Sequence, residues 1–179
     1  MKVLESDLPY VTHMDYSNLD KIKQLLYVIS QSAPFKPNIE KLSERLHIGK
    51  NTLKLYLKYL QDASIINTLY SSKKGITLLT KPEKIYLHHP NLMQCLSSDQ
   101  ADKGNMRESF FLNQIQHLYP VQYPEQGDFF VNNRWLFEIG GKNKGKKQIR
   151  DHANAWLALD GIETGYGNTI PLWLFGFLY

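Results

Sequence analysis

The stretch Gly127–Arg150 constrains the fold most, because it places two short apolar runs side by side and follows them with a basic loop. The runs Asp128–Val131 and Trp135–Ile139 have the length and composition of β-strands. Each run carries one acid, Asp128 or Glu138. A double glycine and five cations follow: Lys142, Lys144, Lys146, Lys147 and Arg150. The segment predicts a hairpin beside a cationic loop, an arrangement that can hold a divalent metal against a phosphate backbone.

The length of the hairpin loop decides whether the two acids lie together. If Asn132-Asn133 is a two-residue turn, Asp128 pairs with Phe137 and points away from Glu138. If the loop is Asn132–Arg134, the two acids lie directly opposite each other on one face. The sequence permits either arrangement.

Composition and charge exclude several protein classes. Of the 179 residues, 42% are hydrophobic and 21% are charged, which is typical of one or two globular domains. The net charge of +4 favours polyanionic partners only weakly. The one cysteine, Cys95, excludes an internal disulfide, and no apolar run approaches the roughly 20 residues of a membrane-spanning helix. We therefore expect a soluble cytoplasmic protein without membrane contact.

The N-terminal half has the pattern of a winged helix-turn-helix over residues 17–90. A capping box begins the first helix, and two prolines end it. Asn38 caps a second helix, and after a glycine-containing turn a third helix runs from about 51–63. The segments 65–70 and 76–79 flank a polar turn, so they predict the two strands of a wing.

Polar and basic side chains on the third helix and at the wing tip are candidates for DNA contact. Side chains of this kind contact phosphates and base edges when such a helix lies in a major groove. The candidates are Lys50, Asn51, Lys54, Lys58, Lys73 and Lys74, joined by Lys144, Lys146 and Lys147 of the basic loop. The alternative is a solvated face on a domain used for protein contacts or as a spacer.

The C-terminal half, residues 105–179, has the pattern of an α/β (α+β) domain, with the boundary to the first domain between Pro90 and Gly104. The predicted order is helix, three strands, helix and strand, over 105–118, 121–123, 128–131, 135–139, 146–152 and 155–159. Periodicity does not separate strand from helix in the last segment, and a strand is predicted because the sheet needs one more element. The fold class is therefore a winged helix-turn-helix followed by a small mixed β-sheet flanked by helices.

Glu108 lies on the apolar side of the predicted helix 105–118. Phe111, Leu112 and Ile115 follow it at the third, fourth and seventh positions, which places the carboxylate on the inward stripe. A buried carboxylate is costly unless it is paired, protonated or bound to a metal. A structural ion pair is the plainer interpretation, and the two strand acids make a shared site the alternative.

Seven segments spread over most of the chain resemble a known family. They are LESDLPYV, PFKPNIEKLSERLHIGKNTLKLYLKYLQDASII, KPEKIYL, GNMRESFFLNQI, GDFFV, FEIGGKNKGKKQI and GYGNTIPLWLFGFLY. Together they resemble the C-terminal region of a large group of prokaryotic AAA+ ATPases, in which a winged helix and a restriction-endonuclease-like domain of unknown function follow the ATPase. The resemblance implies that residues 1–16 are the leader from an upstream ATPase domain. The sequence has no GxxxxGK[ST] motif, so ATP would bind only in that upstream domain.

The element order of the second half also resembles the core of PD-(D/E)xK nucleases. The resemblance places Glu108 at the helix acid, Asp128 at the second-strand acid and Glu138 in the (D/E)xK element. These three acids would hold Mg²⁺ in an active enzyme, and no other cofactor is expected. Glycine at position 140 stands where that element has lysine; Lys142, which shares the strand parity, would complete the catalytic set, and Lys144 could also substitute.

We therefore expect the C-terminal accessory region of an AAA+-type ATPase, with a degenerate nuclease-like core. It would bind nucleic acid, with DNA as the expected partner of the candidate residues above, or couple the ATPase domain to a partner. One alternative is a metal-dependent nuclease that cleaves DNA phosphodiester bonds, and another is a protein-interaction platform without nucleic acid. Three acids within metal-bridging distance favour the nuclease, whereas scattered acids favour the binding module.

Overall fold

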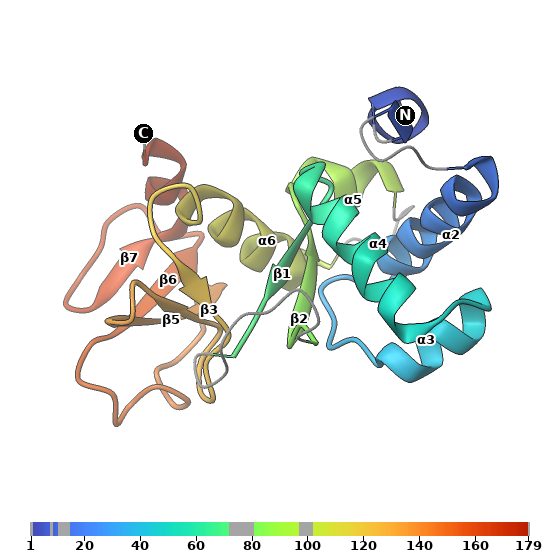
Figure 1. The fold of residues 1–179 in the computed structure, drawn as a ribbon. Helices are drawn as coiled ribbons and strands as arrows, with labels where there is room; N and C mark the ends of the chain where they lie inside the picture. The colour runs from blue at the N-terminus through green and yellow to red at the C-terminus, as the bar shows by residue number, and fades with distance from the viewer. Residues whose placement is uncertain (1, 8, 11–14, 72–80, 97–101, 179) are drawn as a thin grey trace. The chain divides into compact units, whose positions relative to one another are not determined.

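The computed structural model describes residues 2–7, 9–10, 15–71, 81–96 and 102–178 (Figure 1). The chain divides into two compact units. The first unit comprises Met1–Thr68 and Ile76–Ser98, and the second comprises Leu69–Gly75 and Asp99–Tyr179. The division after Ser98 falls between Pro90 and Gly104, but Leu69–Gly75, expected in the first domain, belong to the second unit. Helices combined with a mixed sheet and a small antiparallel sheet confirm the predicted α+β class.

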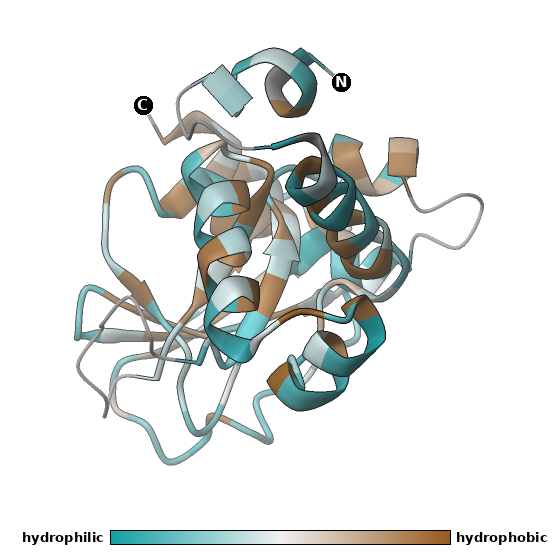
Figure 2. Ribbon diagram, turned by 45° about the vertical axis from the view of Figure 1, so that its right-hand side comes forward, coloured by the Kyte–Doolittle hydropathy of each residue, from teal (hydrophilic) through white to brown (hydrophobic). Residues whose placement is uncertain are grey.

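The first unit is built on helices that bury one apolar side each. Its helices are η1 (Val3–Asp7, a π-helix), α2 (Tyr16–Ser32), α3 (Ile39–Leu46), α4 (Lys50–Asp62) and α5 (Pro90–Leu96). The segment expected to be a leader contributes η1, in which Leu4 is fully buried and Glu5 pairs with Lys23 of α2. Figure 2 shows hydrophilic and hydrophobic residues alternating along the helices, as amphipathic packing requires.

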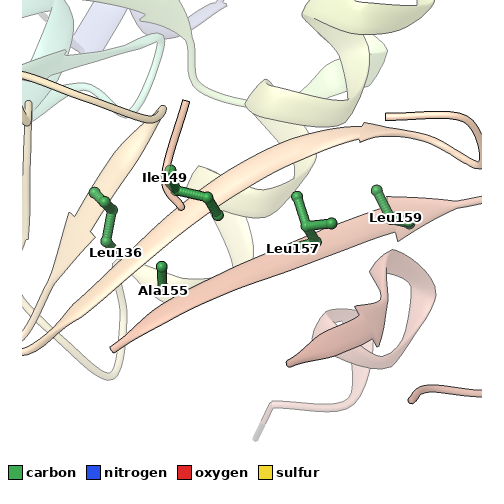
Figure 3. Packing of buried hydrophobic residues seen from close by; sticks show 5 residues of the cluster. All are labelled: Leu136, Ile149, Ala155, Leu157 and Leu159. Carbon is green, nitrogen blue, oxygen red and sulfur yellow. The ribbon is translucent and has the colours of Figure 1, made fainter. Parts of the chain in front are cut away.

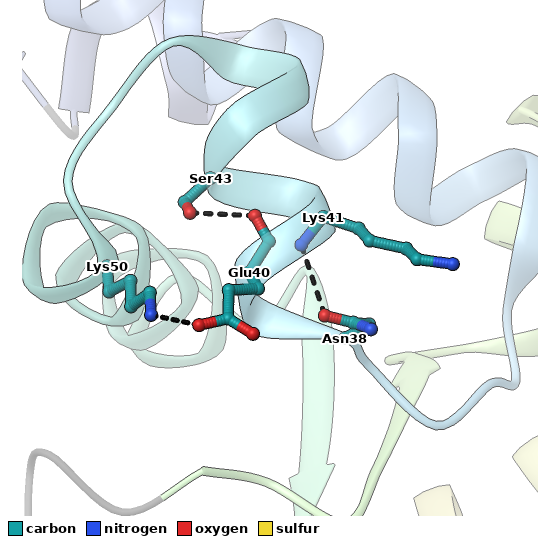
Figure 4. Close-up of polar contacts among 5 residues, drawn as sticks. All are labelled: Asn38, Glu40, Lys41, Ser43 and Lys50. Atoms are coloured by element: carbon teal, nitrogen blue, oxygen red, sulfur yellow. Dashed lines mark hydrogen bonds and ion pairs between the residues drawn. The ribbon is translucent and has the colours of Figure 1, made fainter.

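The helix-turn-helix part follows the prediction except at its start. The expected capping box is absent, because α2 begins at Tyr16 with Asp15 at its N-cap and no side-chain cap hydrogen bond. Asn38 caps α3 by accepting a hydrogen bond from the Lys41 amide at 3.1 Å (Figure 4). His47, with φ at 53°, ends that helix in the left-handed conformation. The helix α4 then begins after Gly49 and buries Leu53, Tyr56, Leu57 and Leu60.

The small sheet of the first unit pairs β1 (Ile66–Leu69) with β2 (Lys84–Leu87). Phe35 extends it through an antiparallel bridge to Ile85. The expected second wing strand at 76–79 lies outside the described residues, as do Lys73 and Lys74 of the expected wing tip. The helix α5, which lies in the expected boundary region, was not predicted from the sequence.

In the described part of the second unit, five strands form one mixed sheet in chain order. They are β3 (Val121–Gln122), β4 (Phe129–Val131), β5 (Trp135–Gly141), β6 (Ala155–Asp160) and β7 (Thr169–Pro171). The pairs β3–β4 and β4–β5 are antiparallel, whereas β5–β6 and β6–β7 are parallel. The helix α6 (Lys103–Ile115) precedes the sheet, and a 3₁₀ helix, η2 (Leu172–Phe177), follows it.

Different layers cover the two faces of β5. Phe111 of α6 packs on the aromatic rings of Phe129, Phe137 and Phe175, with ring centroids 4.7–5.1 Å apart. Side chains of opposite parity, beginning with Leu136, form a second apolar cluster with Ile149, Ala155, Leu157 and Leu159 (Figure 3). Because side chains alternate along a strand, Glu138 shares the face of Leu136. Its carboxylate therefore meets the crossover segment 142–154.

The predicted helix at 146–152 is wrong. The segment forms successive turns, in which Ile149 donates to the Lys146 carbonyl at 3.1 Å and His152 donates to the Ile149 carbonyl at 3.2 Å. Within 142–154, Ile149 is the one buried residue. A helix there would have no apolar stripe to bury, so turns that anchor a single isoleucine are sufficient.

Candidate functional site

The hairpin between β4 and β5 has the longer of the two loops left open by the sequence. Phe129 pairs with Phe137 and Val131 pairs with Trp135, which leaves Asn132–Arg134 as the loop. The first two loop residues, both asparagines, adopt positive φ values of 52° and 51°. Asparagine tolerates this conformation better than most residues, which explains the pair at this position.

Asp128 forms hydrogen bonds to β5 on both sides of Glu138. The backbone amide of Asp128 donates to the Phe137 carbonyl at 2.9 Å, and its carboxylate accepts from the Ile139 amide at 2.7 Å. The two strand acids are therefore neighbours, as the three-residue loop requires. One oxygen of Asp128 is committed to holding the backbone next to Glu138.

Glu138 is a fully buried carboxylate with a cationic partner. The Lys144 ammonium lies 2.5 Å from its Oε1, and the lysine side chain keeps 37% of its surface exposed. The Gln148 amide lies 3.1 Å and 3.3 Å from the two Glu138 oxygens, and its nitrogen, turned toward them, donates to both. A buried charge needs such partners, because an uncompensated carboxylate at this depth would be strongly destabilising.

Glycine at position 140 makes room for the side chain of Lys144. A Cβ added to Gly140 would lie 2.5 Å from both Cβ and Cγ of Lys144 and 3.1 Å from its Cδ. The lysine therefore crosses directly over the glycine on its way to Glu138. The ammonium comes from Lys144, whereas Lys142, the preferred substitute for the expected lysine, is exposed and is not the partner in this ion pair.

The surrounding acids hold the Lys144 ammonium in its charged form. Partial burial by itself lowers the pKa of Lys144. The hydrogen bond and charge of Glu138, followed by the charges of Asp128 and Glu108, outweigh that effect, so the pKa lies above its ordinary value. All three predicted acids thus act on one ammonium group.

The three acids do not form a metal-ligand cluster. Among the described residues, which include Glu108, Asp128 and Glu138, no three His, Cys, Asp or Glu side chains gather closely enough to hold a metal ion. Mg²⁺ is often held by two carboxylates and water. Here, however, Oε1 of Glu138 contacts an ammonium and Oδ2 of Asp128 accepts a backbone hydrogen bond. In this arrangement the donor set fits the chain's own cation and does not fit Mg²⁺.

The predicted DNA-contacting residues of α4 lie on its exposed or half-buried surface. Lys50 pairs with Glu40 (Figure 4), and Lys58 pairs with Asp62 at 2.7 Å. Surface ion pairs of this kind contribute little free energy, so a phosphate could replace the carboxylate. Asn51 is exposed and Lys54 is half-buried. In the second unit, Lys146 and Lys147 are exposed.

The positions of Gln148, Arg107 and Asp160 around the site were not predicted from the sequence. Gln148 was assigned to a helix, and nothing in its neighbourhood pointed to a buried carboxylate. Arg107 donates to Asp160 at 2.8 Å and lies next to Gly141, so α6 contributes a cation as well as Glu108. The adjacency of Arg107 to Glu108 was the one available signal.

Comparison with known proteins places the chain in a family of undefined function. Within the described residues, no helix has both the length and the apolar character needed to cross a membrane. Neither a curated protein nor a solved structure matches the chain. A family model described as "Domain of unknown function (DUF8612)" matches residues 1–103, which is more than half of the sequence. The chain therefore belongs to the DUF8612 family of domains of unknown function.

Proposed function

We propose that this chain is a cytoplasmic nucleic-acid-binding region that serves an AAA+-type ATPase, and that its nuclease-like core binds without cutting. The observation that carries the proposal is the ion pair between Lys144 and buried Glu138 across Gly140. The Lys144 ammonium neutralises the Glu138 carboxylate, which a nuclease would need as a metal ligand. Exposed cations beside it, Lys146 and Lys147 among them, remain available to phosphates.

The ATPase part of the proposal comes from the segments that resemble the C-terminal region of AAA+ ATPases. The nucleic-acid part is supported by exposed basic residues in both units. The alternative hypothesis is a protein-interaction platform that does not bind nucleic acid. It requires the same fold, and the two hypotheses differ only in what the basic residues contact. Salt dependence separates the two, because each phosphate that is neutralised releases condensed counterions.

The direct test is the salt dependence of DNA binding. Affinity for duplex and for single-stranded DNA would be measured by fluorescence anisotropy at several salt concentrations. Replacing Lys54, Lys58, Lys73 and Lys74 with Ala is expected to weaken binding to all sequences and to reduce the salt slope by about one unit per lost contact. Exposed Lys103 on α6 gives the matched control, Lys103→Ala. No binding by the unaltered protein would favour the platform, and binding unaffected by the four changes would exclude α4 and the wing.

A second candidate, a metal-dependent nuclease, is favoured by the same lysine. Lys144 supplies an ammonium next to Glu138, with Asp128 as a neighbour, which replaces the cation lost at Gly140. A preorganised charge of this kind is worth on the order of 10²–10³ in rate. The nuclease hypothesis requires the Glu138 carboxylate to bind a metal ion in place of the Lys144 ammonium.

Cleavage assays decide between the two candidates. We expect no cutting of plasmid or single-stranded DNA above background with either Mg²⁺ or Mn²⁺. Robust cutting that Glu138→Ala abolishes would overturn this expectation and establish the nuclease. In that case Lys144→Met should lower the rate by about 10²–10³. The exposed Lys103→Ala control should leave it nearly unchanged.

A further inference from the structure

A second basic feature lies next to the acid site, at the carboxyl ends of the parallel strands β5 and β6. It is an open hollow of about 560 Å³, lined by Arg107, Gly141, Lys142, Asn143, Lys144, Asp160 and Gly161. The size is within the usual range for small-ligand sites. In open sheets with parallel strands, ligands commonly bind in the crevice outside the carboxyl ends of those strands.

Arg107 is held in place on the wall of the hollow. Its Nε donates to Oδ2 of Asp160 at 2.8 Å, and a Cβ added to Gly141 would lie 3.5 Å from its terminal guanidinium atoms. The guanidinium therefore lies against a glycine with no side chain to cover it. The Asp160 bond uses only one of the five guanidinium N–H groups, and a fork with fixed geometry suits phosphate oxygens.

Lys142 provides the second charge. It is exposed, lines the same hollow, and has no ion-pair partner in the described part of the chain. The charges of Arg107 and Lys144 are balanced by Asp160 and Glu138, which leaves Lys142 as the excess positive charge. An anion entering the hollow would meet a positioned guanidinium fork and an exposed ammonium.

We infer that this hollow binds a phosphate group of a nucleic-acid strand, an inference that rests on the proposed function. None of the lining residues is aromatic among those described, so the hollow offers no platform on which a base could stack. Recognition would therefore be of the backbone and independent of base sequence. Because Lys144 lines the hollow and pairs with Glu138, the bound phosphate lies beside the acid site.

The test compares Lys142→Gln and Arg107→Gln with two controls that remove exposed charges elsewhere in the second unit, Lys103→Gln and Arg134→Gln. The probe is a fluorescein-labelled oligothymidylate, with affinity measured by anisotropy across a salt series. Lys142→Gln should reduce the salt slope by about one unit. Arg107→Gln should weaken binding about tenfold or more, since a charge-assisted hydrogen bond is lost. The control variants should change both quantities less. Thermal unfolding shows whether the Arg107→Gln variant is folded. If it is not, the Lys142→Gln variant alone decides the test, because Lys142 is exposed.

Inorganic phosphate and pyrophosphate form a second arm, measured by isothermal titration calorimetry and as competitors of the oligonucleotide. Competition that Lys142→Gln removes supports the phosphate site. Oligonucleotide binding that is unchanged in the Lys142 and Arg107 variants overturns the inference while leaving the proposed function intact. If the unaltered protein binds phosphate ions and no nucleic acid, the hollow is a phosphate site and the proposed function fails.

Discussion

Replacing Lys144 with methionine is expected to lower the free energy of unfolding of the second unit by about 3 kcal/mol. Removing one partner of a buried ion pair typically costs about 3–5 kcal/mol, because the other charge stays buried without compensation. The lower end applies here, since the Lys144 side chain is 37% exposed and Gln148 still donates to the carboxylate. Methionine retains most of the aliphatic chain over Gly140, so the change removes charge more than volume.

Chemical denaturation of the Lys144→Met, Glu138→Gln and double variants measures this effect. A double-mutant cycle isolates the coupling between the two side chains, and the double variant should be less destabilised than the sum of the single changes. Lys146→Met is the matched control, because Lys146 is exposed in the same segment. A loss below about 0.5 kcal/mol for Lys144→Met, the range of ordinary surface changes, would contradict a buried ion pair.

The same pair gives a pH signature with a definite sign. The pKa of Lys144 is raised in the folded protein relative to its ordinary value of 10.5. The stabilisation is therefore complete below the unfolded pKa and is lost as the pH rises through the folded pKa. The difference in stability between the unaltered protein and Lys144→Met should consequently narrow above about pH 10.5. Subtracting the two curves removes the contributions of the other lysines and tyrosines.

Short-range patterns in the sequence predicted the elements of this site well. The apolar stripe of α6, the two hairpin strands and the Asn38 cap each depend on a few neighbouring residues, and each is present. Glu108, expected on the buried side of α6, is half-buried, and Asp128 lies one residue before β4. The hairpin loop stayed open because both lengths are compatible with asparagines. Its register is fixed by which side chains are buried on β4, a property of the whole sheet.

The sequence favoured Lys142 over Lys144 as the substitute lysine only because the alternation of side chains was extended beyond the end of the strand. Lys142 has the parity of Glu138, but β5 ends at Gly141, and the Lys144 amide donates to the Gly141 carbonyl at 2.9 Å. This turn reverses the chain and returns Lys144 over Gly140. A parity argument holds only while the backbone stays extended.

Pairings between distant segments were the least predictable part. In the first unit, β1 pairs with β2, a pairing that the sequence did not indicate, and the expected wing strand at 76–79 lies outside the described residues. In the second unit, turns replace the predicted helix after β5, because the crossover needs only Ile149 to close the cluster on that face. Local propensity carries little information about either outcome.

Gly140→Ala is expected to destabilise the second unit, although a strand interior normally favours alanine. Elsewhere the change would stabilise by about 0.5–1 kcal/mol, because glycine loses more conformational freedom on folding. At this position the new Cβ would lie 2.5 Å from Cβ of Lys144, an atom whose position the loop backbone fixes. Overpacking costs about 1–3 kcal/mol, and displacement of Lys144 from Glu138 adds to it.

Gly145→Ala provides the matched control, because Gly145 lies in the same loop and a Cβ there meets nothing within 4 Å. We expect it to be neutral or slightly stabilising in the same denaturation experiment. In a Lys144→Gly background, where the clashing side chain is gone, Gly140→Ala should cost little more. Such non-additivity is expected only of residues in direct contact. If instead Gly140→Ala is equally costly with and without the Lys144 side chain, the glycine is required for a reason other than the passage of that lysine.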